Sequence, residues 1–385
     1  MSQKSTHITD LFGTLPTPSY IIDENVLRRN GEILASVAAH TGCKILLAQK
    51  AFSNYDFYPL LSEYLSGTEA SGLYEARLGA EEMPDKEVHV FCGAYRDDEF
   101  EELLTYADHI VFNSPHQFKK FAQKAKAAGK SIGIRINPEC STQDGHAIYD
   151  PCAPGSRLGT TRAVWNREMT GEWISLLDGL HFHTLCEQDS DDLETTLAAV
   201  ERSFGDILPQ MKWLNMGGGH HITRNDYDIA RLEKCITYAQ DKWNLCVYLE
   251  PGEAVALNAG YLITRVLDIV ENNGMHIAIL DTSAACHMPD VIEMPYMPPL
   301  YGAKAVTDTP ATNADSKYPD FVYRLAGPTC LAGDVLGDYT FAAPLHEGDL
   351  LVFQDMAIYS TCKNNTFNGM PLPDIYKMQT DGAFV

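Results

Sequence analysis

The sequence predicts an α/β fold in which a (β/α)8 barrel is followed by an all-β domain. Between Cys43 and Glu250, eight short β-rich runs alternate with helical stretches. Eight strand–helix units that close on themselves form a barrel, and the length suits one. After Ala259, short strand-like runs are separated by turns rich in Gly, Pro, Asn and Asp, which is typical of an all-β domain. A doubly wound open sheet is the alternative, but it normally has fewer strands.

The expected elements follow in chain order. The barrel strands are Cys43–Gln49, Gly67–Ser71, Glu87–Cys92, His109–Asn113, Ser131–Ile136, Gly179–His183, Trp213–Gly217 and Cys246–Glu250. Helical character is found in Pro115–Ala128, Trp165–Leu177, Asp191–Ile207 and Asp226–Trp243. The β domain contains Tyr261–Val270, His276–Asp281, Phe321–Ala326 and Leu350–Phe353, with Pro298–Asp320 as an exposed excursion. Because Ser19–Ile22 can add a strand to it, we expect residues 24–258 to form the barrel, and residues 1–23 with 259–385 to form the β domain.

Composition narrows the classes of function. The ten cysteines include no close CxxC pair, the first residues have no apolar signal core, and no run approaches a membrane span. We therefore expect a cytoplasmic protein with reduced thiols and no membrane partner. The net charge of −23 argues against nucleic acid as a partner and favours cationic ligands such as polyamines.

Lys50 ends the first predicted strand, after the apolar run Ile45–Ala48. In an α/β barrel, catalytic groups gather at the carboxyl ends of the strands. A lysine at that edge is partly desolvated, which favours a neutral, nucleophilic amine that can bind an aldehyde cofactor. The alternative is a lysine that extends its ammonium group into solvent.

Three other strand ends carry candidate groups. His181 and His183 share one face of the sixth strand, which suits either a metal pair or one ring lying flat on a cofactor. Gly217–Gly219 expose backbone donors suitable for a phosphate, although a plain turn is the alternative. Arg135 ends the fifth strand and can bridge by hydrogen bonds to the acid that ends the eighth, although a purely structural ion pair is equally consistent.

That acid is Glu250, which opens the tetrapeptide Glu-Pro-Gly-Glu. Pro251 ends the strand because it lacks a backbone donor, and Gly252 allows a close approach of the backbone to a ligand. A carboxylate followed by bare backbone suits pyridoxal 5'-phosphate, which needs an acid at its pyridine nitrogen and amides around its phosphate. A strand-end turn with a solvated Glu is the alternative.

The order and spacing of these motifs resemble the fold-type III pyridoxal phosphate enzymes, the alanine racemase-like barrels that include ornithine and diaminopimelate decarboxylases. The matching segments are Lys50, His183, Gly217–Gly219, Glu250–Gly252, Gly327–Cys330, Met356–Tyr359 and Asn365–Gly369. Three further segments most resemble the branch that decarboxylates carboxynorspermidine or carboxyspermidine: Gln49–Phe52, Glu250–Glu253 and Cys330–Asp334. Cys286–Tyr296 is also similar to that branch.

The resemblance implies a role for each matching residue. Lys50 holds the cofactor, Glu250 keeps its pyridine nitrogen protonated, and His183 stacks on its ring. Gly217, Gly218, Gly219, Gly252 and Tyr359 hold the phosphate. Arg135 orients Glu250, and Cys330 returns a proton across the interface of a homodimer with shared active sites. For Cys330 a buried, inert thiol is the alternative.

The expected substrate is an α-amino acid with a polyamine tail, whose cationic nitrogens need carboxylates. Glu253 is the first candidate because relatives place Arg there; Asp290 and Asp334 follow. The sequence leaves open carboxynorspermidine against carboxyspermidine, which differ by one methylene. The rivals are an ornithine or diaminopimelate decarboxylase, a non-catalytic homologue, and a metal-dependent hydrolase. That hydrolase would use the ligands His181, His183, His220 and His221.

Overall fold

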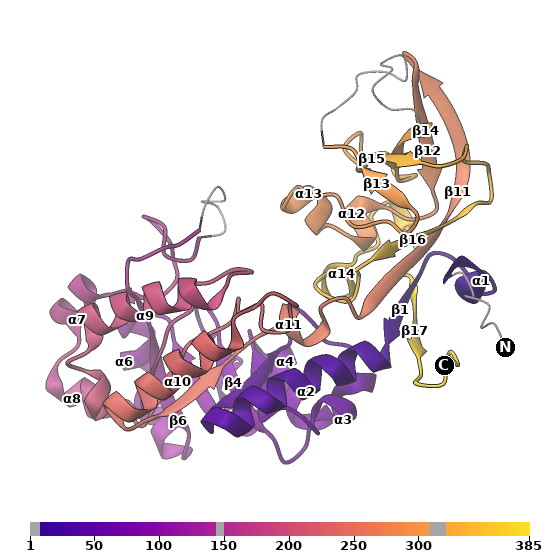
Figure 1. The fold of residues 1–385 in the computed structure, drawn as a ribbon. Helices are drawn as coiled ribbons and strands as arrows, with labels where there is room; N and C mark the ends of the chain where they lie inside the picture. The colour runs from indigo at the N-terminus through magenta and orange to yellow at the C-terminus, as the bar shows by residue number, and fades with distance from the viewer. Residues whose placement is uncertain (1–7, 144–149, 308–320) are drawn as a thin grey trace. The chain divides into compact units, whose positions relative to one another are not determined.

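The computed structural model describes residues 8–143, 150–307 and 321–385. The chain folds into two compact units (Figure 1). One is Arg28–Val255, and the other combines Met1–Leu27 with Ala256–Val385. Within the described residues, no helix is both long and apolar enough to span a bilayer.

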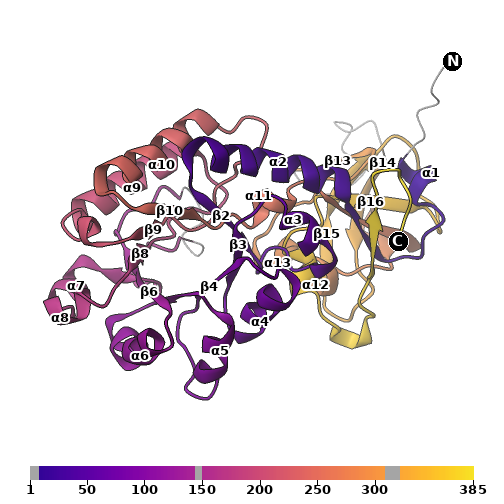
Figure 2. The same ribbon diagram turned by 90° about the horizontal axis from the view of Figure 1, so that it is seen from below.

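The larger unit is a closed parallel barrel, which confirms the predicted fold class. Its strands are β2 (Lys44–Ala48), β3 (Gly67–Ala70), β4 (Glu87–Phe91), β5 (His109–Phe112), β6 (Ser131–Asn137), β8 (Gly179–His181), β9 (Trp213–Asn215) and β10 (Cys246–Leu249). The order β5-β4-β3-β2-β10-β9-β8-β6 is closed by pairing of β5 with β6. A short extra strand, β7 (Thr160–Thr161), pairs with the end of β6. Figure 2 shows the strands as a ring with helices outside it.

Side-chain hydrogen bonds cap several of the barrel helices at their amino ends. The barrel helices are α2 (Glu24–Thr41), α3 (Tyr58–Leu61), α4 (Leu73–Glu82), α5 (Phe100–Tyr106), α6 (Pro115–Ala127), α7 (Arg162–Glu168), α8 (Gly171–Ile174), α9 (Ser190–Phe204), α10 (Ile229–Trp243) and α11 (Glu253–Ala256). The Ser114 side chain accepts a hydrogen bond from the amide of Gln117 and so caps α6. Asp189 and Asp192 form a capping box at the start of α9.

The helical character expected over Trp165–Leu177 is divided between two short helices. Helix α7 ends at Glu168, because Met169 adopts an extended backbone conformation (φ −95°, ψ 103°). Thr170 is also extended, and α8 begins only at Gly171. The apolar residues of this segment therefore belong to two short helices instead of one long helix.

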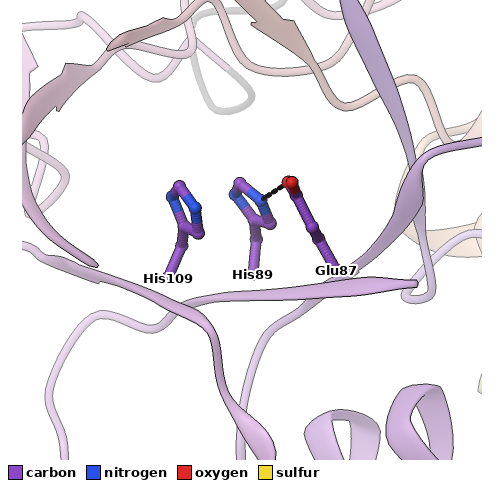
Figure 3. Close-up of side chains that lie close together, drawn as sticks. All are labelled: Glu87, His89 and His109. Atoms are coloured by element: carbon purple, nitrogen blue, oxygen red, sulfur yellow. Dashed lines mark hydrogen bonds and ion pairs between the residues drawn. The ribbon is translucent and has the colours of Figure 1, made fainter. Parts of the chain in front are cut away.

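Side chains fill the amino end of the barrel, opposite the predicted site. Trp213 and Tyr248 belong to its apolar cluster. His89 and His109 stack with their ring centroids 4.0 Å apart and an interplanar angle of 14°. Glu87 lies beside them, with its Oε2 3.0 Å from His89 Nε2 (Figure 3). Packed side chains therefore close this end of the barrel, which we call the floor of the barrel.

The second unit is built on a curled sheet. Its strands are β1 (Ser19–Asp23), β11 (Gly260–Asn272), β12 (Met275–Leu280), β13 (Ala303–Ala305), β14 (Phe321–Ala326), β15 (Val335–Phe341), β16 (Leu350–Gln354) and β17 (Asp374–Met378). The order is β13-β15-β14-β12-β11-β1-β17, and β16 also pairs with β11. As expected, the N-terminal strand joins this sheet, with Tyr20 opposite Leu262.

This unit is not purely β. It contains the short helices α1 (Ile8–Phe12), α12 (Ala284–His287), α13 (Asp290–Glu293) and α14 (Ser360–Lys363). The excursion expected over Pro298–Asp320 is partly wrong, because Ala303–Ala305 pairs with β15. Residues 308–320 of that segment lie outside the described residues.

Candidate active site

Lys50 stands at the carboxyl end of β2, where the sequence placed it. Its Nζ lies 3.4 Å from Oε2 of Glu69, and the Glu69 side chain is 3% exposed. Burial raises the pKa of Glu69 to about 7, although the positive charge of Lys50 opposes this shift. The amine therefore faces a carboxyl group whose charged form is disfavoured by burial.

Sequence reasoning missed Glu69. It occupies the third position of β3, a strand in which all four residues are buried. The signal was present, because an acid inside a fully buried barrel strand needs a cationic partner or a function.

Glu250 is buried at the carboxyl end of β10, and two side chains hold its carboxylate. Its Oε1 accepts a hydrogen bond of 2.5 Å from Asn215 Nδ2, and its Oε2 lies 3.1 Å from His181 Nε2. Burial alone would raise the pKa of Glu250, but His181 and the charge of Lys50 hold it below its ordinary value. Burial also lowers the pKa of His181, so His181 acts as a neutral donor and the carboxylate keeps its charge.

The expected bridge from Arg135 to Glu250 is wrong. Arg135 Nη2 donates to the carbonyl oxygen of His183 at 3.1 Å, and the guanidinium lies 4.7 Å from the ring centroid of Phe91. Burial lowers the pKa of Arg135 to about 10, against the nearby charge of Glu250. Asn215 and His181 are the groups that orient Glu250.

His183 and the glycine triplet meet at the same edge of the barrel. The amide of Gly218 donates to His183 Nδ1 at 3.2 Å, so the neutral imidazole carries its proton on Nε2. Burial, with the charges of Arg135 and Lys50, holds the pKa of His183 well below its ordinary value. The ring is therefore neutral at physiological pH.

The glycines at this edge have steric reasons to be there. Gly219 has a φ of +80°, and a Cβ on it would lie 2.1 Å from the carbonyl oxygen of Leu185. A Cβ on Gly252 would lie 2.6 Å from Cβ of Ala51, which follows Lys50. The amides of Gly219 and Gly252 donate to no acceptor among the described residues. Two unpaired donors beside Lys50 and Glu250 fit an anionic ligand group.

Glu253 begins α11 and forms an ion pair. Its Oε1 lies 3.1 Å from His221 Nε2, and its side chain is 16% exposed. Glu187, in the loop after β8, brings a carboxylate oxygen to the same place. Sequence reasoning missed Glu187 and considered His221 only as a metal ligand.

The remaining candidates lie in the sheet unit. The Cys330 thiol is exposed, and its amide donates to Asn368 Oδ1 at 2.8 Å, which joins two of the motif segments. Tyr359 is half-buried just before α14 and has a φ of +51°.

The two acids proposed for substrate binding in this unit already have partners. Asp334 accepts hydrogen bonds from the hydroxyls of Ser283 and Thr329, at 2.9 and 2.6 Å. Asp290 forms an ion pair with Lys363.

The four histidines of the rival hydrolase do not converge. His181 faces Glu250, and His183 accepts from Gly218. His220 lies against the carbonyl oxygen of Met216, and His221 faces Glu253. Over the described ranges, no group spaced to hold a metal ion contains two of these histidines.

Comparison with known proteins agrees with this geometry. A family model described as "Pyridoxal-dependent decarboxylase, C-terminal sheet domain" matches residues 19–357. The carboxynorspermidine/carboxyspermidine decarboxylase of Campylobacter jejuni is 44% identical, over 94% of this chain and 92% of its own. The carboxyaminopropylagmatine decarboxylase of Synechocystis is 40% identical, over 96% and 92%.

A solved structure is similar along the same length. The carboxynorspermidine decarboxylase of Campylobacter jejuni, in complex with norspermidine, has a TM-score of 0.86 and 42% identity. The match covers 96% of each chain. The family match and these identities lead to one conclusion: the chain belongs to the pyridoxal-dependent decarboxylases.

Proposed function

We propose that this protein uses pyridoxal 5'-phosphate to decarboxylate carboxynorspermidine, carboxyspermidine or both, yielding norspermidine and spermidine. The observation that carries the proposal is the 42% identity, with a TM-score of 0.86, to the Campylobacter jejuni enzyme in complex with norspermidine. The Glu-Pro-Gly-Glu segment supports it, because Glu253 adds negative charge where a cationic tail needs it.

In this proposal the barrel, residues 24–258, holds the cofactor. Lys50 would bind its aldehyde carbon, and Glu250 would keep its ring nitrogen protonated. His183 would support the ring, while Gly217–Gly219, Gly252 and Tyr359 would hold the phosphate. Arg135 fixes the carbonyl of His183 and so supports the ring contact indirectly. When bound, the cofactor supplies the electron sink that accepts the electron pair left as CO2 departs.

The chain's own groups then control charge and protons. Glu250 remains ionised because Asn215 and His181 satisfy it in a dry site. Cys330 donates the proton of its Sγ to the carbon that has lost CO2. An exposed thiol is suited to reach the barrel of a second copy, so we propose a homodimer with shared sites.

The proposal also covers the carboxylates that bind the substrate's distal ammonium groups and the cellular location of the protein. Glu253 is our first candidate for a distal ammonium group. Asp290 and Asp334 are weaker candidates, because each is already partnered. All ten cysteines are free thiols, which supports a reducing, cytoplasmic location.

A substrate panel tests the proposal. Protein loaded with the cofactor is assayed for CO2 release from carboxynorspermidine, carboxyspermidine, carboxyaminopropylagmatine, ornithine and diaminopimelate. We expect kcat/KM for the first two to exceed that for ornithine and diaminopimelate by roughly a hundredfold or more, because unpaired buried carboxylates penalise the wrong tail. The matched blank is Lys50→Ala. Ornithine or diaminopimelate as the best substrate would overturn the proposal.

A further inference from the structure

A group of two glutamates and one histidine on the edge of the barrel has a composition that suits the binding of a cation. Glu187, His221 and Glu253 each bring one ligand atom to within 4.8 Å of the others. They come from three separate segments: the loop after β8, the loop after β9, and the start of α11. We call them the Glu–His–Glu group.

Backbone hydrogen bonds hold two of these segments together. The amide of Gln188 donates to the carbonyl of Gly219 at 2.9 Å, and the amide of His221 donates to the carbonyl of Gln188 at 3.3 Å. The Gln188 side chain is also anchored, by a 2.8 Å bond to the hydroxyl of Thr142. Glu187 itself has a φ of +54°, an uncommon backbone conformation for a residue with a side chain. These bonds hold the loop that carries Glu187 beside the loop that carries His221.

His221 is the buried member of the group. It is 8% exposed, and its Nε2 lies at an ion-pair distance of 3.1 Å from Glu253 Oε1, but neither ring nitrogen makes a hydrogen bond to a described residue. Burial lowers the pKa of His221, but the carboxylates of Glu253 and Glu187 more than reverse this and raise it above the ordinary value.

Other titratable groups nearby do not replace His221 as the local cation. Arg224 is held by Asp189 and Asp226, at 2.5 and 2.6 Å. Burial and the two glutamates raise the pKa of Cys186 to about 11, so its thiol stays neutral.

We propose that the Glu–His–Glu group is the subsite for an ammonium group of the polyamine tail, and that His221 releases its proton when this ammonium binds. In the free protein, the imidazolium neutralises one of the two carboxylates. On binding, the ammonium takes that place, and the His221 proton passes to solvent, so the charge of the subsite is conserved. This inference rests on the proposed function, because it takes the polyamine tail as the ligand.

The proposal gives His221 the role of a pH-dependent competitor. Below its pKa, His221 must lose a proton before the ammonium can bind, so affinity rises with pH. A purely structural His221 would give the opposite mutant phenotype. Removing a structural contact weakens binding at every pH, whereas removing a competitor strengthens binding at acidic pH.

The experiment measures norspermidine binding to the cofactor-loaded protein by calorimetry at pH 6 and pH 8. Parallel runs in buffers of different ionisation enthalpy count the protons released. At pH 6 we expect His221→Asn to release roughly one proton fewer than the parent and to bind at least as tightly. His40→Asn is the matched control, since His40 forms an exposed ion pair with Glu233 at 2.8 Å on α2 and α10.

Glu187→Gln provides an independent arm, because this exposed residue can be changed without unfolding the barrel. We expect it to weaken norspermidine binding roughly tenfold, the loss typical of one charge-assisted contact. Unchanged proton release in His221→Asn, or unchanged affinity in Glu187→Gln, would overturn the subsite. Zn²⁺ retained after dialysis by the parent but not by Glu187→Gln would also overturn it, in favour of a metal site. A parent that decarboxylates neither triamine acid refutes the proposed function instead.

Discussion

Asn215 is the residue whose removal tests the electrostatics of the site most sharply. Its Nδ2 donates to Glu250 Oε1 at 2.5 Å, and its Oδ1 accepts from the amide of Gly217 at 2.9 Å. The Asn215→Ala change replaces no residue proposed to touch the cofactor, although it also removes the acceptor of the Gly217 amide. It removes one of the two hydrogen bonds that keep the buried carboxylate of Glu250 ionised.

The size of the effect follows from the kind of bond that is lost. A hydrogen bond to a charged group contributes about 1.5–3 kcal/mol. If that free energy supports the ionised state needed in the transition state, kcat falls by roughly 10- to 150-fold. The pKa of Glu250 should also rise, because a buried carboxylate that loses a hydrogen-bond donor is harder to ionise.

The assay is CO2 release at saturating substrate, with cofactor content measured in the same samples by absorbance. Asn30→Ala is the matched control, because Asn30 is equally buried and donates to a backbone carbonyl, that of Val255, at 3.2 Å. Both variants should lose stability to a similar extent, but only Asn215→Ala should lose turnover. A kcat for Asn215→Ala within twofold of that for Asn30→Ala, at equal cofactor content, would refute the reasoning.

Two further predictions concern the tail of the substrate and the floor of the barrel. Glu253→Arg should raise KM for the triamine acids far more than it lowers cofactor occupancy, because it places a cation where the ammonium binds; unchanged kinetics would remove Glu253 from substrate binding. Burial, and the neighbouring His89, lower the pKa of His109 to about 3. Below pH 6.5 the unfolded chain therefore binds a proton that the folded barrel excludes, and stability is lost as the pH falls. His109→Phe keeps the stack and should reduce this loss at pH 5 by about 2 kcal/mol, measured by urea unfolding at pH 7.5 and pH 5. An identical pH dependence in the two proteins would contradict a neutral His109.

The barrel was predictable because each of its strands is a short, buried run bounded by turn residues, from Lys44–Ala48 to Cys246–Leu249. The break at Met169 was not, because apolar spacing continues across two short helices. The strand Asp374–Met378 was also missed. It has no clear alternation and is held by pairing with β1, a partner far away in the chain.

The candidate site was also predictable only in part. Strand ends located Lys50, His183 and Glu250, because parallel strands bring their carboxyl ends to one edge of the barrel. The residues that contact these groups were missed, because the contacts depend on side-chain length and conformation, which a sequence pattern does not give. Glu69 lies inside β3, Asn215 ends β9 two residues before the glycine triplet, and the guanidinium of Arg135 donates to the His183 carbonyl instead of Glu250.

The central claim is that the cofactor is held at Lys50, on the edge of the barrel where Glu250 and the glycine triplet meet. Reduction of the cofactor-loaded protein with borohydride, followed by digestion and mass spectrometry, identifies the lysine that carries it. We expect a reduced cofactor on the peptide that contains Lys50, and none on that peptide in Lys50→Ala. A reduced cofactor on any other lysine, or a colourless protein that does not react, would show that Lys50 does not hold the cofactor.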